Sequence, residues 1–280
     1  MVKITLLGTG IPTPNPDRMG SCIAIEINQK PILFDCGRSA VTQMTRAGLD
    51  PSMVEYVFLT HHHFDHTVGL PDLLLGSWMT GRDTEINIFG PTGTSDFVKA
   101  VLEAFKIDIT ARKESRGNRP GAASKLEVIA KDFVDGLIFQ NDEWKVRAVK
   151  VDHLPGAVGF RLDTADRSVV FSGDTKPSQA LTELAEGADL LIHEVFFSPE
   201  LEATGAPVGR KKQFVNPQWA QRVRHTKPHE VSKLASQAGV KRLALTHLWS
   251  SQNLDRLREI VAKDFSGEII IGQDLLSLEI

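Results

Sequence analysis

The run Thr60-His61-His62-His63-Phe64-Asp65-His66 places four histidines and a carboxylate within six residues, directly after the apolar stretch 54–59. Neutral imidazole and carboxylate are the ligands that divalent transition metals take in proteins, and this density is enough for a pair of ions. The apolar stretch predicts a strand, and a helix is expected after the run. The sequence therefore predicts metal ligands on a tight loop between a strand and a helix.

Composition and charge are those of an ordinary globular protein. The chain has 280 residues, of which 41% are hydrophobic and 24% charged, and this argues for a globular fold rather than a disordered chain. The net charge of −3 gives no global basic field that would attract nucleic acid, although a local basic patch stays open. Cys22 and Cys36 are the only two cysteines, so we expect reduced, buried thiols and no disulfide framework.

The beginning of the chain predicts its location. Residues 2–8 read at once as an apolar strand, with no charged region followed by a long apolar one, so no secretory signal is expected. No apolar stretch approaches the 18 or so residues that a membrane span needs. We therefore expect a cytoplasmic protein with no membrane partner.

Strand and helix patterns alternate along the whole chain. Strands are expected at 2–7, 22–27, 32–34, 54–59, 85–89, 126–129, 137–139, 144–151, 157–162, 168–171, 190–193 and 242–245. Helices are expected at 39–47, 70–79, 95–105, 177–185, 228–238 and 253–262. No linker separates the two halves, so the prediction is a single α/β domain over residues 1–280, with a sheet sandwich inside helical layers.

Two segments are predicted as surface loops. Residues 110–124 combine arginines and a lysine with glycines, which indicates a mobile surface loop, with a lid or substrate contact as the alternative. Residues 199–218 carry Arg210, Lys211 and Lys212 close to Phe214. That mixture suits an anionic, partly aromatic ligand, a partner subunit or a solvated basic turn, and the sequence does not choose among them.

Further metal-ligand candidates follow other predicted strands. His153 follows 144–151, Asp174 follows 168–171 and His247 follows 242–245. All these strand ends could meet at one edge of the sheets. Alternate residues of an extended segment point the same way, so His61 and His63 could share one metal while Asp65 and His66 serve a second.

The ordered motifs resemble the metallo-β-lactamase superfamily, specifically its ribonuclease Z and arylsulfatase-like branch. They are Leu7-Gly8-Thr9-Gly10, Phe34-Asp35-Cys36-Gly37, the run 60–66, His153, Ser172-Gly173-Asp174-Thr175, Leu191-Ile192-His193-Glu194, His225 and Leu245-Thr246-His247-Leu248. The resemblance spans nearly the whole chain. It implies a four-layer αββα sandwich.

The same resemblance implies a ligand set for two zinc ions. One ion would take His61, His63 and His153, the other would take Asp65, His66 and His247, and Asp174 would bridge both. Manganese or iron could occupy the same ligands. A hydroxide held between two such ions is a strong nucleophile at neutral pH, which indicates a hydrolase.

The catalytic candidates are His225, Glu194 and Asp65, the last of which is also a ligand candidate. By resemblance, His225 assists at the scissile bond and Glu194 orients it, because a carboxylate fixes the tautomer of its imidazole. The alternatives are a surface residue at a helix start for His225 and a backbone contact for Glu194. His62, His193 and His229 are expected not to be ligands, and Asp35 is expected to brace its loop.

The substrate prediction depends on one departure from the resembling family and on the net charge of −3, which gives no general attraction to a phosphate backbone. Members that process tRNA carry a long arm between the third histidine motif and the bridging aspartate, whereas 20 residues separate His153 from Asp174 here. We therefore expect a binuclear zinc hydrolase of small esters, most plausibly phosphodiesters or sulfate esters, with a lactone possible, and tRNA as an unlikely partner. The alternatives are a tRNA 3′ endonuclease, an iron-bound redox or oxygenase member, and a binding protein with an inactive site. A homodimer stays open.

Overall fold

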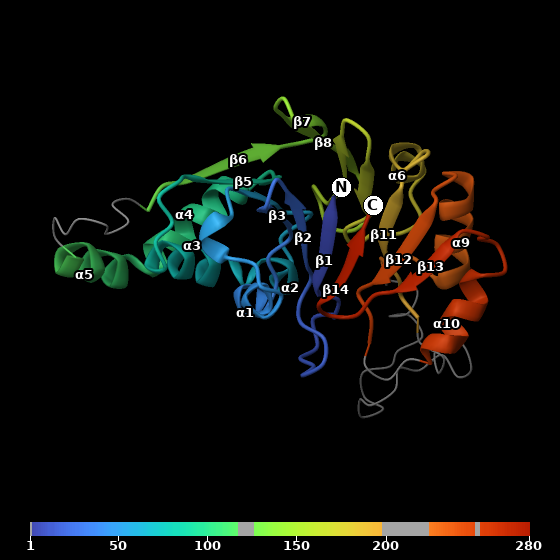
Figure 1. Cartoon of the computed structure of the whole chain (residues 1–280), viewed down its shortest axis with the longest axis horizontal. Helices are drawn as coiled ribbons and strands as arrows, with labels where there is room; N and C mark the ends of the chain where they lie inside the picture. The colour runs from blue at the N-terminus through green and yellow to red at the C-terminus, as the bar shows by residue number, and fades with distance from the viewer. Residues whose placement is uncertain (1, 117–125, 198–223, 250–252) are drawn as a thin grey trace. The chain divides into compact units, whose positions relative to one another are not determined.

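The computed structural model describes residues 2–116, 126–197, 224–249 and 253–280 (Figure 1). Chain contacts divide it into two compact units. Unit 1 comprises Met1–Gly8, Met19–Val134 and Asp274–Glu279, and unit 2 comprises Thr9–Arg18, Asp135–Gln273 and Ile280. Each unit is described by itself below. The single domain over 1–280 stays a prediction.

The described part of unit 1 holds one seven-stranded sheet, in the order β14-β1-β2-β3-β4-β5-β6. Its strands are β1 (Lys3–Gly8), β2 (Cys22–Ile27), β3 (Lys30–Phe34), β4 (Tyr56–Phe58), β5 (Ile86–Pro91), β6 (Val128–Phe133) and β14 (Leu276–Glu279). Strands β3 to β6 run parallel, whereas β14, β1 and β2 pair antiparallel. The carboxyl ends of the four parallel strands therefore meet at one edge of the sheet, where ligand sites commonly form.

The helices of unit 1 are α1 (Ala40–Arg46), the 3₁₀ turn η1 (Pro51–Met53), α2 (Phe64–Thr67), α3 (Leu70–Met79), α4 (Thr94–Ala104) and α5 (Lys106–Arg116) (Figure 1). Of these, α1, α3 and α4 contribute buried side chains to the apolar core on this sheet. Leu70, Leu73 and Leu74 follow helical spacing on α3 and are fully buried. They join the strand residues Leu33 and Val57 in one apolar core, which holds the helix layer against the sheet.

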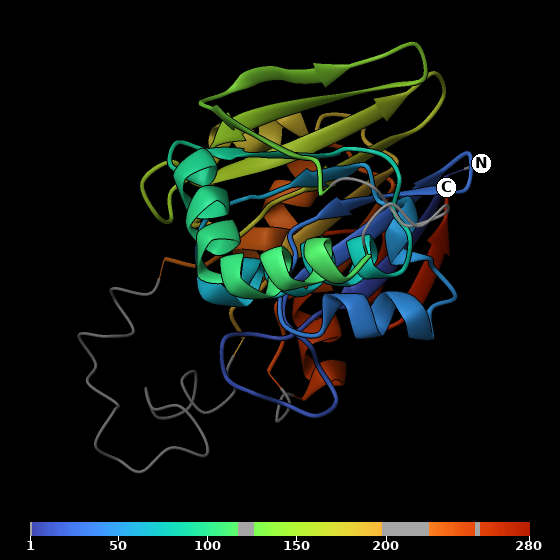
Figure 2. The ribbon, with the colours of Figure 1, turned by 90° about the vertical axis from the view of Figure 1, so that its left-hand side faces the viewer.

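Helix α5 corrects the prediction of a loop over residues 110–124. Residues 110–116 continue α5, and Figure 2 shows it following α4 after a short bend. Asp108 Oδ2 and Arg112 Nε lie 2.7 Å apart one turn along the helix, a pairing that favours helix and that the sequence displayed. The glycines that suggested a loop begin only at Gly117, and residues 117–124 lie outside the described residues.

Unit 2 repeats the mixed pattern in a second seven-stranded sheet of the described chain, in the order β13-β12-β11-β10-β9-β8-β7. Its strands are β7 (Gly136–Gln140), β8 (Trp144–Lys150), β9 (Val158–Thr164), β10 (Ser168–Phe171), β11 (Leu190–Glu194), β12 (Arg242–Thr246) and β13 (Glu268–Ile271). Strands β10 to β13 run parallel. Strand β8 points the same way as β10, because each is antiparallel to β9. The carboxyl ends of β8, β10, β11 and β12 therefore share one edge.

Helices α6 (Gln179–Leu184), α9 (Pro228–Gln237) and α10 (Leu254–Val261) pack on the sheet of unit 2. Side-chain caps begin two of them: Ser178 accepts from the N–H of Leu181, and Asn253 accepts from the N–H of Arg256. Leu181, Val231 and Leu257, one from each helix, are fully buried with the strand residue Leu243. The helix and strand positions predicted for this half are confirmed to within a few residues. Among the described residues, no helix has the length and apolar character to cross a membrane.

Candidate metal centre

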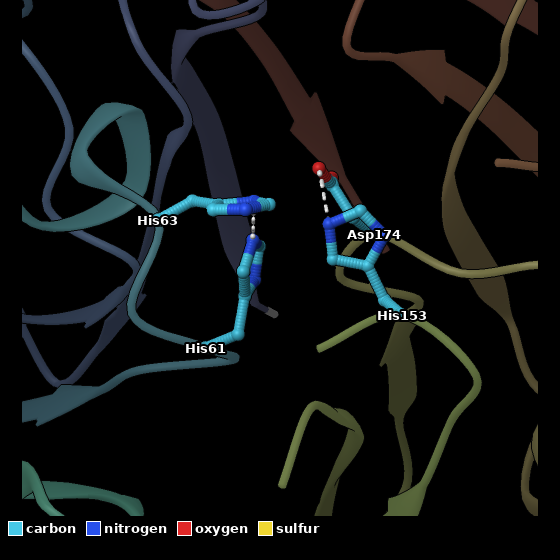
Figure 3. Close-up of side chains that lie close together, drawn as sticks. All are labelled: His61, His63, His153 and Asp174. Atoms are coloured by element: carbon cyan, nitrogen blue, oxygen red, sulfur yellow. Dashed lines mark hydrogen bonds and ion pairs between the residues drawn. The ribbon is translucent and has the colours of Figure 1, made fainter. Parts of the chain in front are cut away.

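In unit 1 the candidate ligands follow strand β4 at the carboxyl edge of the parallel strands. The backbone N–H of Leu59 donates to Phe89 O at 2.8 Å, so the chain after β4 remains hydrogen-bonded to β5 until the histidine run begins. His61 Nε2 and His63 Nδ1 then lie 3.0 Å apart (Figure 3). Two nitrogens bound to one tetrahedral zinc at about 2.05 Å would lie roughly 3.3 Å apart. The pair therefore already has a spacing close to that of two ligands on one ion.

Asp35, which follows β3, fixes the next ligand candidate. Its Oδ2 lies 2.7 Å from His66 Nδ1, and both side chains are buried. A carboxylate accepts, so Nδ1 of His66 carries the proton and Nε2 presents its lone pair. Nε2 of His66 lies 3.6 Å from Asp65 Oδ2, whose side chain is also buried. Asp35 therefore selects the tautomer in which His66 can bind a metal.

Thr60 selects the tautomer of His61 in the same way. Its Oγ1 lies 2.9 Å from Asp35 Oδ2 and 3.0 Å from His61 Nδ1. The hydroxyl has one proton, which goes to the carboxylate, so it must accept from His61 Nδ1. Nε2 of His61 then carries the lone pair of the ring, and it faces His63. Asp35 itself sits at φ 60°, in the left-handed region that non-glycine residues seldom adopt.

His62 points away from this group, as its alternate position predicts. Its Nε2 lies 2.8 Å from Thr94 Oγ1, and Thr94 in turn donates to the carbonyl of Pro91. The Thr94 proton is thereby used, so His62 must donate from Nε2. Burial lowers the pKa of His62. His62 thus ties the ligand loop to the start of α4.

In unit 2 the candidate ligands gather around Asp174, which follows β10. Its Oδ2 lies 3.4 Å from Nε2 of His247, after β12, and 3.7 Å from Nε2 of His153, after β8 (Figure 3). Asp174, His247 and His225 offer ligand-type atoms within 4.8 Å of one another. His247 sits at φ 60°, in the left-handed region that Asp35 also adopts.

A backbone carbonyl orients His153. Its Nδ1 lies 2.8 Å from Arg224 O, and Arg224 donates back to the carbonyl of His153 at 2.7 Å. A carbonyl only accepts, so Nδ1 carries the proton and Nε2 faces Asp174. Burial lowers the pKa of His153, against the opposing effect of the Asp174 carboxylate. The ring is therefore neutral near neutral pH, which is the form that binds a metal.

His225 is paired with Glu194 rather than with a carbonyl. Nδ1 of His225 lies 3.0 Å from Glu194 Oε1, and that oxygen also accepts from the backbone N–H of Thr175 and of Thr226. Glu194 is buried, whereas the side chain of His225 is 18% exposed. The anchored carboxylate thus holds a partly exposed imidazole, with its Nδ1 4.0 Å from Asp174 Oδ2.

Two other histidines of unit 2 do not belong to the groups of ligand-type atoms found among the described residues. His193 is fully buried on β11, its Nδ1 donates to the backbone carbonyl of Glu194 at 2.6 Å, and burial lowers its pKa. His229 is exposed on α9. Thr60, Thr94 and Arg224 support the site but were missed from the sequence. Only Thr60 carried a signal, because it stands beside the first histidine of the run.

The donor set in each unit fits a divalent transition metal. Unit 1 offers His61, His63, His66 and Asp65, and unit 2 offers His153, His247 and Asp174. In His61, His66 and His153 the Nδ1 proton is committed to an acceptor, which leaves Nε2 for a metal. Buried imidazole nitrogens with carboxylate oxygens are the ligands of zinc and its neighbours. The chemistry of the residues therefore fits divalent metal binding.

Comparison with known proteins identifies the class. The family model described as the beta-lactamase superfamily domain matches residues 30–248. The metallo-β-lactamase fold protein YhfI from Bacillus subtilis is similar in structure, with a TM-score of 0.73 at 20% identity, over 99% of this chain and 98% of that one. The predicted metallo-β-lactamase fold, of the αββα type, is thereby confirmed. The chain is a metal-dependent hydrolase of this superfamily.

Sequence relatives narrow the class further. Ribonuclease Z from Mycobacterium marinum is 34% identical over 289 residues, which cover all of this chain and 99% of the relative. The short form of human tRNase Z has a TM-score of 0.73 at 24% identity, over 99% of each chain. The chain belongs to the ribonuclease Z branch of the metallo-β-lactamase superfamily.

These relatives overturn the substrate prediction. The expected small-ester hydrolase, with tRNA as an unlikely partner, is wrong, because the full-length relatives are named Ribonuclease Z. The short span between His153 and Asp174 was the wrong discriminator. An alignment of 289 residues against 280 leaves the Mycobacterium marinum relative no room for a long additional arm either. Net charge failed as well, because it averages over the whole chain and does not describe the surface beside a site.

Proposed function

We propose that this protein is a tRNA 3′ endonuclease of the ribonuclease Z type. The observation that carries the proposal is the full-length likeness to Ribonuclease Z at 34% identity. The geometry supports it, because the ligand-type residues of each unit are oriented for metal binding and a carboxylate-held histidine lies beside Asp174. A cytoplasmic location and a homodimer stay predictions, and residues 199–218 lie outside the described residues.

We further propose the ligand set. His61, His63 and His153 would bind one ion, Asp65, His66 and His247 the other, and Asp174 both. Zinc is the proposed metal because it takes imidazole and carboxylate ligands at four-coordinate sites, although manganese or iron suits the same donors. When bound, such a pair supplies a water that is deprotonated near neutral pH and positive charge for the phosphoryl oxygens.

The protein's own residues would handle the proton of the leaving group. Glu194 accepts from His225 Nδ1, which aims Nε2 away from the carboxylate. A protonated His225 can then donate from Nε2 to the leaving oxygen, while Glu194 stabilises the charged ring. The two backbone N–H donors on Glu194 Oε1 keep that carboxylate in place through the step. Glu194 is thus a positioning residue and His225 the proton donor.

The test is cleavage of a 3′-extended precursor tRNA by metal-analysed protein, with the new 3′ end mapped to the nucleotide. We expect one cut after the discriminator nucleotide, and none in mature tRNA. Aryl phosphate and aryl sulfate esters serve as the comparison substrates. The proposal is rejected if the protein binds its metals but leaves precursor tRNA intact at low salt, where phosphate contacts are strongest.

A further inference from the structure

Phe64 is an aromatic residue exposed in the middle of the ligand run. It is the first residue of α2, between His63 and Asp65, and 56% of its surface is exposed. The three residues that follow it in α2, Asp65, His66 and Thr67, are all buried. The helix therefore turns its polar ligand residues inward and its phenyl ring outward, the reverse of the usual placement.

Val68 extends this apolar surface. It follows Phe64 by one helical turn, its N–H donates to the carbonyl of Phe64 at 2.8 Å, and its surface is 48% exposed. Residues four apart lie on the same face of a helix. Neither side chain belongs to the apolar core of the unit, which is built from other residues.

We propose that Phe64 stacks on a nucleobase next to the phosphate that is cut. This inference rests on the proposed function. Phe64 is bonded on one side to a ligand candidate of the first ion and on the other to a ligand candidate of the second. Its Cα lies about 3.8 Å from the Cα of each. Ions held by these neighbours would bind the scissile phosphate, which would bring the bases of the flanking nucleotides near the ring.

A base is the occupant that the surroundings favour. Stacking on an aromatic face tolerates any base, which suits an enzyme that must accept many tRNA sequences at the cut. The ring also brings no charge next to the ligand residues, so it adds contact without competing for the phosphate. A second copy of the chain or a protein partner would instead make binding depend on Phe64 without regard to the bases of the RNA.

The experiment compares Phe64→Ala, Phe64→Leu and Phe64→Trp with the parent on precursor tRNA. Ile107→Ala is the control, because Ile107 is the more exposed side chain, at 87%, and belongs to α5 of the same unit. We expect Phe64→Ala to lower kcat/KM about 5- to 150-fold, equivalent to about 1–3 kcal/mol of stacking. Phe64→Trp should retain activity and Phe64→Leu should fall between. Metal content should equal that of the parent in all four variants.

A second set of substrates isolates the base. Precursor tRNAs with an abasic nucleotide on one or the other side of the cut should slow the parent by a similar factor, and should slow Phe64→Ala no further. If the abasic and Phe64→Ala losses multiply instead, or if Phe64→Ala cleaves as fast as the parent, stacking is excluded. If the parent itself leaves precursor tRNA intact, the proposed function fails and the stacking role fails with it, and that outcome is read from the parent alone.

Discussion

Each of the two units orients a histidine with a buried carboxylate, but the two histidines differ in exposure. In unit 1, Asp35 accepts from Thr60 and from His66, and the His66 side chain is only 2% exposed. In unit 2, Glu194 accepts from two backbone N–H groups and from His225, whose side chain is 18% exposed. Both carboxylates are buried at strand ends.

The difference lies in what the held imidazole can reach. His66 presents Nε2 to the buried oxygens of Asp65, and at this buried position Nε2 can act only as a metal ligand. His225 is open enough to meet a substrate and stays beside Asp174. On the proposed roles, the carboxylate that orients the buried His66 would serve metal affinity, whereas the one that orients the partly exposed His225 would serve proton transfer. The predictions below separate these two roles.

The largest effect is expected at Asp174, which is proposed to bind both ions. We expect Asp174→Ala to abolish both the pairing of metals and the activity, because it removes the carboxylate that His153 and His247 approach. Metal content by elemental analysis and cleavage of precursor tRNA measure the two losses. Asp166→Ala is the matched control on an exposed turn of the same unit. Full metal content in Asp174→Ala would contradict the bridging role.

His225→Ala comes next and should split metal binding from turnover. We expect kcat to fall about 10²–10⁴-fold, the usual contribution of a positioned proton donor, while both metals remain bound. His229→Ala, on the exposed side of α9, provides the control. Normal turnover in His225→Ala would remove this residue from the mechanism.

Much of the site could be read from the sequence because parallel strands impose it. Asp35 and His247 directly follow strands that are parallel to a neighbour, His61 and Asp174 follow such strands after two further residues, and these strands end at one edge of their sheet. The hydrogen-bond partners that orient the histidines are harder to predict from the sequence. The carbonyl of Arg224 orients His153 from 71 residues away, and every residue has a carbonyl, so no side-chain pattern marks this one.

The substrate was the part that sequence reasoning read wrongly, for a physical reason. The proposed ligand residues would supply an attacking water, and the same water could act on small esters and on RNA. The short span between β8 and β10 leaves no room for an arm there, yet recognition of a large ligand can be spread over many surface side chains. Phe64 illustrates this, because its exposure appears only in the structure, whereas in sequence it reads as one more apolar residue.

Asp35→Asn tests the affinity side of the comparison. Asparagine keeps one oxygen for the N–H of Thr60, but its amide nitrogen cannot accept from His66 Nδ1. We expect metal affinity to fall about 10–100-fold, with turnover restored when metal is added in excess. Competition with a chelator gives the affinity.

Glu194→Gln supplies the counterpart in unit 2. The glutamine oxygen can still accept from the backbone N–H groups and from His225, so the geometry is kept while the charge is lost. We expect metal affinity equal to that of the parent and a lower kcat. Equal losses of metal affinity in Asp35→Asn and Glu194→Gln would show that both carboxylates serve metal binding and would contradict the different roles proposed for them.

The smallest effect is expected from the pH dependence of stability. Burial lowers the pKa of His193 in unit 2 and, in a less buried place, of His62 in unit 1. A histidine with a folded-state pKa below its unfolded value of about 6.5 stabilises the fold above that pH and loses this contribution as the pH falls toward its folded value. We expect the free energy of unfolding of the metal-free protein to decrease as the pH is lowered below about 6.5.

This decrease should be smaller in His193→Asn than in His62→Asn, because charging the fully buried ring costs more than charging the partly buried one. Asparagine can still donate to the carbonyl of Glu194, and His229→Asn is the exposed control. Identical pH profiles for the parent and His193→Asn would show that this buried ring does not govern the acid limb.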